Sequence, residues 1–302
     1  MVSVDSSINR PPALSVVATP GKRTQILELA AEAERLGFSS IACPTLGNAL
    51  GLCTSLAHVT ERIRFYTSIQ GIYGTSPAEI GSLASHIHEV SGGRFALGLG
   101  VSHEVMVRRL GVTMGPPLGD MRAFVDELHG LEKWSGPLPP IFLATLRDRM
   151  LALAVEIASG ALWANASLRY TSRQVAHLVG RGGFHLANMI PTVIDDDVDA
   201  AAAVNEKTMQ TYLRLPNYRN YWKAAGWIEQ MEAAEAAASD PARPPIPVDR
   251  AWLADCTAFG PAAAVLERFS EWRAAGVEPI AVMSSTSGGQ AHAIRQLFDL
   301  YR

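Results

Sequence analysis

The chain has 302 residues, a formal net charge of −3 and an apolar fraction of 48%, which is enough for a core that buries roughly three quarters of the unfolded surface. Its 26 lysines and arginines are spread along the chain, which argues against nucleic acid or an anionic membrane as a partner. The three cysteines have no disulfide-framework or metal-ligand spacing, so we expect no metal site.

The amino-terminal stretch "MVSVDSSINRPPALSVV" has no basic segment followed by a long apolar core and a small-residue cleavage site. No apolar run in the chain approaches the roughly 18 residues of a membrane-spanning helix. We therefore expect a cytoplasmic protein.

Two kinds of segment alternate along the chain. Short apolar runs that are typical of buried strands lie at 13–18, 38–43, 63–69, 94–100, 140–145, 161–166, 184–194 and 279–285. Segments with helical periodicity lie between them or after them, at 21–37, 49–61, 76–93, 118–134, 147–160, 171–182, 195–215, 260–277 and 290–302. Helical material also continues after residue 215 through Ala238, and a proline-rich loop follows at 240–249. Residues 76–93 illustrate the signals, since Ser76 is a favoured N-cap and Pro77 suits a first helical turn.

Eight strand and helix units in 302 residues predict a single (β/α)8 TIM barrel rather than an open doubly wound sheet. All strands are then parallel and all crossovers right-handed. We expect one domain, residues 1–302, with insertions after the fourth and seventh strands. An active site in such a barrel lies where the carboxyl ends of the strands meet the loops that follow them.

The stretch "SGGRFALGLGVSHE" holds four glycines around the fourth predicted strand. The first two end a helix, where a left-handed C-cap favours glycine. Gly98 and Gly100 lie instead at the carboxyl end of the strand, where a missing side chain lets a flat ligand or a phosphate approach the backbone. Ser102 and His103 follow directly, and the alternative interpretation of this pair is a helix cap and a solvated histidine.

Several segments together resemble the bacterial-luciferase-like superfamily, and most closely its branch that uses the deazaflavin coenzyme F420. The segments match the family in their order and in their spacing along the chain. They are "LGFSSIACP", "ERIRFYTSIQGIYGTSPAEIG", "SGGRFALGLGVSHE", "PIFLATLRDRMLALAVEIASG" and "FGPAAAVLERFSEWRAAGVEPIAV". The resemblance implies an oxidoreductase that transfers a hydride between coenzyme F420 and a small organic substrate. It also implies a homodimer formed through helices on one side of the barrel, with residues 77–90 as a contributor.

The resemblance assigns cofactor-binding positions at the ends of four strands. It implies a non-prolyl cis peptide between Ser68 and Ile69, which supports the back of the deazaflavin ring. Three further sets of positions follow from the resemblance: the loop after the fourth strand, the phosphate-binding turn after the fifth strand, and the end of the sixth strand beside the cofactor tail. They are Val101, Ser102 and His103; Thr145, Leu146 and Arg147; and Trp163 and Ala164. With Gly98 and Gly100, which the missing side chains already suggested, they make up the predicted cofactor site.

The chain departs from the family pattern at the proton donor. Family members commonly carry an acidic residue and a histidine after the second strand, where this chain has Thr45 and Leu46. Neither side chain can exchange a proton as an acid–base pair would. We therefore expect His103 or Tyr73 to supply the proton, although Tyr73 is equally interpretable as a loop anchor.

The turn after the fifth strand also departs from the family. It reads "ATLRDRM" where a glycine-rich turn is usual, and it offers Arg147 and Arg149 as charged phosphate donors. Two alternatives to the F420 oxidoreductase therefore stay open. One is a luciferase-like monooxygenase that uses FMN and oxygen, and the other is a non-catalytic paralogue that binds a cofactor or a partner.

Overall fold

The structure is a computed structural model, and it describes residues 10–240, 242 and 244–302. The described residues form two compact units. The first unit comprises Pro11–Trp163 and Arg181–Ala187, and the second comprises Arg10, Ala164–Gly180 and Asn188–Arg302 without the two undescribed positions. The expectation of one domain over residues 1–302 stays a prediction.

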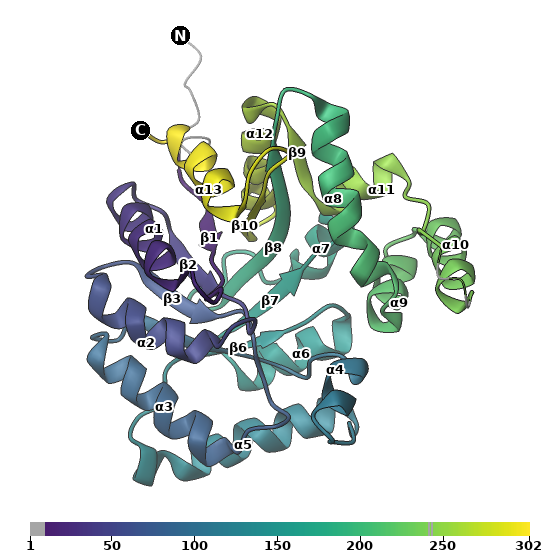
Figure 1. Cartoon of the computed structure of the whole chain (residues 1–302). Coiled ribbons are helices and arrows are strands. Elements are labelled where there is room, and N and C mark those ends of the chain that lie inside the picture. The colour runs from purple at the N-terminus through teal and green to yellow at the C-terminus, as the bar shows by residue number, and fades with distance from the viewer. Residues whose placement is uncertain (1–9, 241, 243) are drawn as a thin grey trace. The chain divides into compact units, whose positions relative to one another are not determined.

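The first unit alternates strands and helices along the chain (Figure 1). Its elements are β1 (Ala13–Ser15), α1 (Arg23–Arg35), β2 (Ser40–Cys43), α2 (Ala49–Val59), β3 (Arg64–Thr67), β4 (Gln70–Gly71), α3 (Pro77–Val90), β5 (Phe95–Gly100), α4 (Glu104–Arg109), α5 (Pro117–Ser135), β6 (Ile141–Ala144), α6 (Asp148–Ile157) and most of β7 (Gly160–Ala164). The strands pair in parallel in the order β1, β2, β3, β5, β6, β7, and β4 also pairs with β5.

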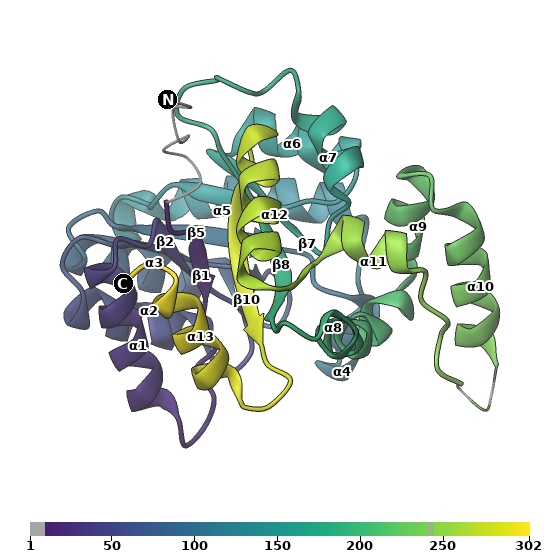
Figure 2. The same ribbon diagram turned by 90° about the horizontal axis from the view of Figure 1, so that it is seen from above.

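The second unit holds the rest of the helices and strands. They are α7 (Leu168–Val175), most of β8 (His185–Ile194), α8 (Val198–Leu213), α9 (Pro216–Ala224), α10 (Ile228–Ser239), α11 (Arg250–Cys256), β9 (Ala258–Gly260), α12 (Ala262–Ala274), β10 (Glu278–Ser284) and α13 (Gln290–Asp299). Helices α9 and α10 lie side by side in both views (Figure 2). Strands β8 and β9 pair in parallel, from Thr192 opposite Ala258 to Ile194 opposite Gly260.

The sheet confirms the predicted fold class. Its strands follow the order β10-β1-β2-β3-β5-β6-β7-β8-β9, and an additional β8–β10 pairing closes eight of them into a parallel (β/α)8 barrel with helices around it. All eight predicted strands are present, and helix α3 begins with the predicted N-cap Ser76 and Pro77, where Ser76 also forms a capping box with Glu79. Among the described residues, no helix is both long enough and apolar enough to cross a bilayer.

Three aromatic rings pack together in the first unit. The Phe142 ring of β6 stacks on His185 with a centroid distance of 4.9 Å, and Tyr66 of β3 meets both rings edge-on. Gly160 makes this packing possible, because a Cβ there would lie 2.7 Å from Phe142 Cδ1 and 2.9 Å from His185 Cβ. The Nε2 atom of His185 is buried and has no hydrogen-bond partner among the described residues.

The environment of His185 predicts that the folded protein loses stability in acid. Burial, and then the charge of Arg64, lower the pKa of His185 to about 4. The unfolded chain binds this proton near pH 6.5 and the folded chain only near pH 4, so the stability from the neutral ring is complete above about pH 6.5 and is lost as the pH falls toward 4. We expect this loss to reach about 3 kcal/mol.

Urea unfolding at a series of pH values tests this prediction. His185→Phe keeps a ring on Phe142 and removes the titrating group, so its unfolding free energy should fall about 3 kcal/mol less than that of the wild type between pH 7 and pH 4. His58→Gln, on an exposed position of α2, is the matched control and should follow the wild type. If the unfolding free energies of the wild type and of His185→Phe fell equally between pH 7 and pH 4, the prediction would be contradicted.

Candidate functional site

A one-residue register shift lies where the third predicted strand approaches β5. Tyr66 of β3 pairs with Ala96, whereas Gln70 of β4 pairs with Leu99. Three residues, 67 to 69, therefore face two, 97 and 98. Such a bulge bends the strand and turns its side chains toward a new direction, which is common next to active sites.

The side chain of Thr67 spans this bulge. Its Oγ1 donates a hydrogen bond to the Gly98 carbonyl at 2.8 Å and accepts one from the Gly98 amide at 2.9 Å. The peptide bond between Ser68 and Ile69 is cis, which confirms the expected geometry. The Ser68 amide donates to the Cys43 carbonyl at 2.8 Å, and the buried Ser68 hydroxyl has no partner in the described part of the chain.

The two glycines of β5 have distinct reasons to lack a side chain. A Cβ at Gly98 would lie 1.9 Å from the Thr67 carbonyl oxygen, a backbone atom that cannot give way. A Cβ at Gly100 would lie 2.7 Å from Ile69 Cδ1 and 3.0 Å from Ala144 Cβ. Gly100 therefore makes room for the Ile69 side chain, and its contact with a cofactor stays a prediction.

The loop after β5 carries Val101, Ser102 and His103, and all three are half-buried. Ser102 has a left-handed backbone with φ at 60°, which is uncommon for a residue other than glycine. His103 is the N-cap of α4, and its carbonyl accepts from the amides of Met106 and Val107 at 2.8 and 3.0 Å. The Nδ1 atom of His103 is buried. The structure thus holds the His103 ring at the carboxyl end of β5.

Tyr73 lies in the loop between β4 and α3. Its hydroxyl donates a hydrogen bond to Asp120 in the first turn of α5. Burial, and then this hydrogen bond, raise the pKa of Tyr73 to about 12. The hydroxyl proton is therefore directed at Asp120, a geometry that favours the loop-anchor interpretation, while the role of Tyr73 as a proton donor stays a prediction.

The turn after β6 places the predicted phosphate-binding residues at the start of α6. Thr145 is buried, and its amide donates to the Leu162 carbonyl at 2.8 Å. Leu146 is half-buried, whereas Arg147 and Arg149 are exposed on either side of the first residue of α6. This end of α6 therefore presents two positive charges to solvent.

The two predicted cofactor-binding residues at the end of β7, Trp163 and Ala164, point to opposite faces of the strand. The Cδ1 of Leu162 lies 3.1 Å from the position of a Gly98 Cβ, so Leu162 and, by alternation along the strand, Ala164 face the same side as Gly98. Trp163 points to the opposite face and is 1% exposed. Its Nε1 has no hydrogen-bond partner among the described residues. Cofactor contact by Trp163 and Ala164 stays a prediction, and the strand geometry favours Ala164.

The loop after β2 holds a leucine where the family pattern has a proton-exchanging residue. Leu46 is 63% exposed. The two residues that follow it, Gly47 and Asn48, both have left-handed backbones, and a Cβ at Gly47 would lie 2.5 Å from the Ala18 carbonyl oxygen. Asn48 caps α2 by accepting from the Gly51 amide at 2.9 Å. The loop is thus held in one conformation that presents Leu46 to solvent.

Sequence reasoning missed two residues that organise this end of the barrel, Thr67 and Asp120. Thr67 reads as an ordinary strand residue, and Asp120 reads as an acidic residue that suits the positive end of a helix. Their partners lie 31 and 47 residues away in the chain, so no local pattern could have shown these contacts.

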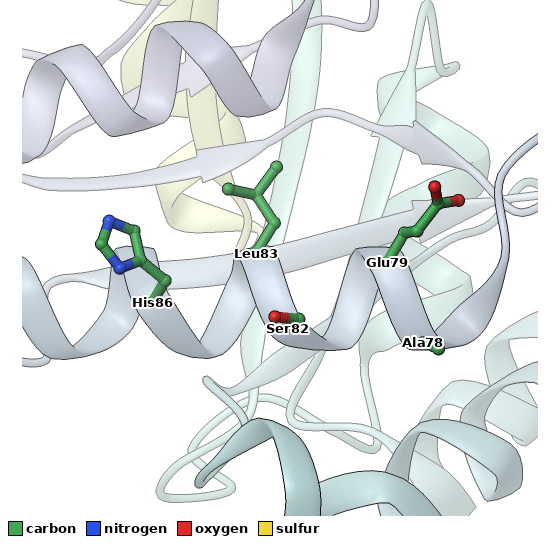
Figure 3. A pocket seen from close by; sticks show the side chains of 5 residues that line it. All are labelled: Ala78, Glu79, Ser82, Leu83 and His86. Carbon is green, nitrogen blue, oxygen red and sulfur yellow. The ribbon is translucent and has the colours of Figure 1, made fainter.

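Two further features lie away from the strand ends. A shallow hollow on the outer side of α3 is lined by side chains from that helix alone, as Figure 3 shows: Ala78, Glu79, Ser82, Leu83 and His86. Within the described ranges, no group of three histidine, cysteine, aspartate or glutamate side chains could hold a metal ion.

Comparisons with known proteins place this geometry in context. Residues 10–279 match the model of the luciferase-like monooxygenase family. A 5,10-methylenetetrahydromethanopterin reductase from Archaeoglobus fulgidus is 32% identical over 134 residues, which are 38% of this chain and 40% of that protein. The chain therefore matches less than half of that relative's length.

Two solved structures share the fold. The coenzyme F420 dependent tetrahydromethanopterin reductase from Methanopyrus kandleri has a TM-score of 0.75 at 18% identity, with 96% of this chain and 97% of that chain covered. An F420-dependent secondary alcohol dehydrogenase in complex with an F420-acetone adduct has a TM-score of 0.69 at 13% identity, with 97% and 99% covered. Because the family model spans most of the sequence, the chain belongs to the luciferase-like monooxygenase family.

Proposed function

We propose that the protein is an oxidoreductase that transfers a hydride between the deazaflavin coenzyme F420 and a small organic substrate. The observation that carries this proposal is the register shift at residues 67 to 69, with Ile69 seated on Gly100. It lies where the family resemblance expects the back of the deazaflavin ring. The two solved structures with this fold, which are named as coenzyme F420 dependent, support the same cofactor class.

Two properties of the site fit a flat polar ring. The Ser68 hydroxyl is buried without a partner among the described residues, so a ligand atom could complete its hydrogen bonding. A Cβ at Gly71 would meet no atom nearer than Ser102 Cβ at 4.0 Å, so the end of β4 has open space beside it. The residues present therefore fit the group.

When bound, coenzyme F420 supplies the hydride chemistry, and the chain supplies position, charge and a proton. Ser68, Ile69 and the backbone of Val101 and Ser102 would hold the ring. Thr145, Leu146 and the charge of Arg147 would hold the phosphate of the tail, and Ala164 would flank it. His103 would hold the proton that the substrate gains or loses.

Binding titrations followed by fluorescence test the proposal. We expect the purified protein to bind oxidised coenzyme F420 at least tenfold more tightly than FMN. Arg147→Ala should weaken binding of coenzyme F420 about tenfold through loss of one charge-assisted contact. Arg62→Ala, which removes an exposed arginine just before β3, is the control and should bind like the wild type. Failure to bind either cofactor would overturn the proposal.

A second candidate function is a monooxygenase that uses reduced FMN and oxygen. The name of the matched family favours it. Tighter binding of FMN than of coenzyme F420, with oxygen consumption by the reduced complex, would select this alternative. A third possibility is a paralogue that binds coenzyme F420 without catalysis. It would bind the coenzyme in the titration and show no single turnover with any substrate. The motive for this test is that Thr45 and Leu46 stand where family members commonly carry an acidic residue and a histidine.

We also propose that the protein is a homodimer that uses the outer face of α3. Leu83 and Val90 of this helix are 36% and 38% exposed, and Leu83 lines the hollow in Figure 3. We expect light scattering at micromolar concentration to give about twice the 32.4 kDa mass of one chain. Leu83→Glu should shift the mass toward one chain, because it places a charge in an apolar contact. A wild-type mass of 32.4 kDa would contradict the proposal.

A further inference from the structure

The segment between β5 and α5, residues 101–116, forms a flap that is weakly attached to the rest of the first unit. Among the flap residues whose side chains the structure describes, only Val107 is buried. Met106 and Leu110 are 46% and 60% exposed. A segment with so few buried contacts opens at a lower free energy than the core unless something else holds it.

The two ends of α4 mark where such a flap could turn. Ser102 before α4 and Gly111 after it both have left-handed backbones, with φ at 60° and 74°. Between them, α4 has only six residues, and it carries an exposed pair between Glu104 and Arg108. These features give the flap a short rigid middle and two distinct bends.

The carboxylate of Asp120 joins the far end of the flap to the β4–α3 loop. Its Oδ2 accepts a hydrogen bond from the Tyr73 hydroxyl and another from the Gly115 amide at 3.0 Å. A Cβ at Gly115 would lie 2.6 and 2.8 Å from the two carboxylate oxygens, so only glycine allows this close approach. We call Tyr73, Gly115 and Asp120 the clasp.

Asp120 lies on a helix that packs into the core. The Asp120 amide donates to the Pro116 carbonyl at 2.9 Å within the first turn of α5. That helix buries Met121, Phe124 and Val125. A second contact supports the clasp, because Leu110 of the flap packs on Gly74, where a Cβ would lie 2.9 Å from Leu110 Cδ1.

We propose that Asp120 is a positioning residue that clasps the flap against the β4–α3 loop, and that opening of the clasp controls release of the ligand bound beside Ser102 and His103. The inference rests on the proposed function for the identity of that ligand. It assigns Tyr73 to flap closure and leaves proton transfer to His103. Asp120 acts on the site indirectly. It holds the flap at Gly115, near one end, whereas Ser102 and His103, at the other end of the flap, belong to the proposed ligand site.

Hydrogen exchange on the ligand-free protein tests the clasp itself. Tyr73→Phe removes only the hydroxyl, and we expect it to speed exchange of the Gly115 amide and of residues 110–114 at least tenfold. Gly115→Ala should do the same by pushing the Asp120 carboxylate away. Arg108→Gln breaks the exposed pair on the same flap without touching the clasp, so its exchange should match the wild type. Unchanged exchange in Tyr73→Phe and Gly115→Ala would overturn the proposal.

Stopped-flow fluorescence with oxidised coenzyme F420 tests the consequence for the ligand. We expect Tyr73→Phe to release the coenzyme at least tenfold faster, with an unfolding midpoint close to that of the wild type. Faster exchange with an unchanged release rate would overturn the link between flap and ligand. If the wild type binds no coenzyme F420, the proposed function is wrong, and the exchange measurement alone decides whether the clasp holds the flap.

Discussion

Gly98→Ala should destabilise the protein by more than about 4 kcal/mol, which is at the upper end for a single substitution. The new Cβ would lie 1.9 Å from the Thr67 carbonyl oxygen, so the two strands must separate. Separation also breaks both hydrogen bonds between the Thr67 hydroxyl and the Gly98 backbone. Urea unfolding followed by circular dichroism measures the loss.

Gly100→Ala is the informative comparison. Its Cβ would meet side-chain atoms, Ile69 Cδ1 at 2.7 Å and Ala144 Cβ at 3.0 Å, rather than a backbone atom, so we expect a smaller stability loss of about 1–3 kcal/mol. Binding of coenzyme F420 should nevertheless weaken more than tenfold, because Ile69 is pushed toward the ring. Gly130→Ala is the control, since a Cβ there meets nothing within 4 Å. A Gly98→Ala protein as stable as Gly130→Ala would contradict the argument.

His103→Gln should slow the chemical step by about 10²-fold while the affinity for coenzyme F420 changes little, as expected for the loss of a general acid. The measurement is a single turnover with preformed reduced cofactor. A general acid acts only when it is protonated. The wild-type rate should therefore fall as rising pH deprotonates this group, and the variant should lose this dependence.

The control for this experiment is His129→Gln. His129 lies on an exposed position of α5 and pairs with Glu132, so its loss should leave both the rate and the pH profile unchanged. A His103→Gln protein with the wild-type rate and pH profile would show that His103 is only a helix N-cap. The proton would then come from solvent or from Tyr73.

The barrel could be predicted from the sequence because its signals are local and repeated. Each of the eight strands is an apolar run that ends near a turn signal, and the long helices carry apolar residues at helical spacing. The elements that escaped prediction are short, namely α4 with six residues, α11 with seven, β9 with three and β4 with two. A pattern needs about 11 residues or more to reveal a helical period and about four or more to reveal strand alternation, so these elements leave no readable signal.

The third predicted strand shows a different limit. Residues 63–69 read as one continuous strand, but the chain divides them between β3 and the bulge before β4. No glycine or proline marks the division. The bulge depends on Gly98, 31 residues further along the chain, and a local pattern carries no information on such a contact.

Thr67 has a consequence for how this end of the barrel responds to heat. A register shift usually leaves backbone groups without ladder partners, yet here one hydroxyl serves both the amide and the carbonyl of Gly98. The irregular strand therefore stays joined to its neighbour on both sides of the bulge. On warming, the Gly98 amide should stay protected until the whole barrel melts, so the surface behind the proposed ring belongs to the same cooperative unit as the core.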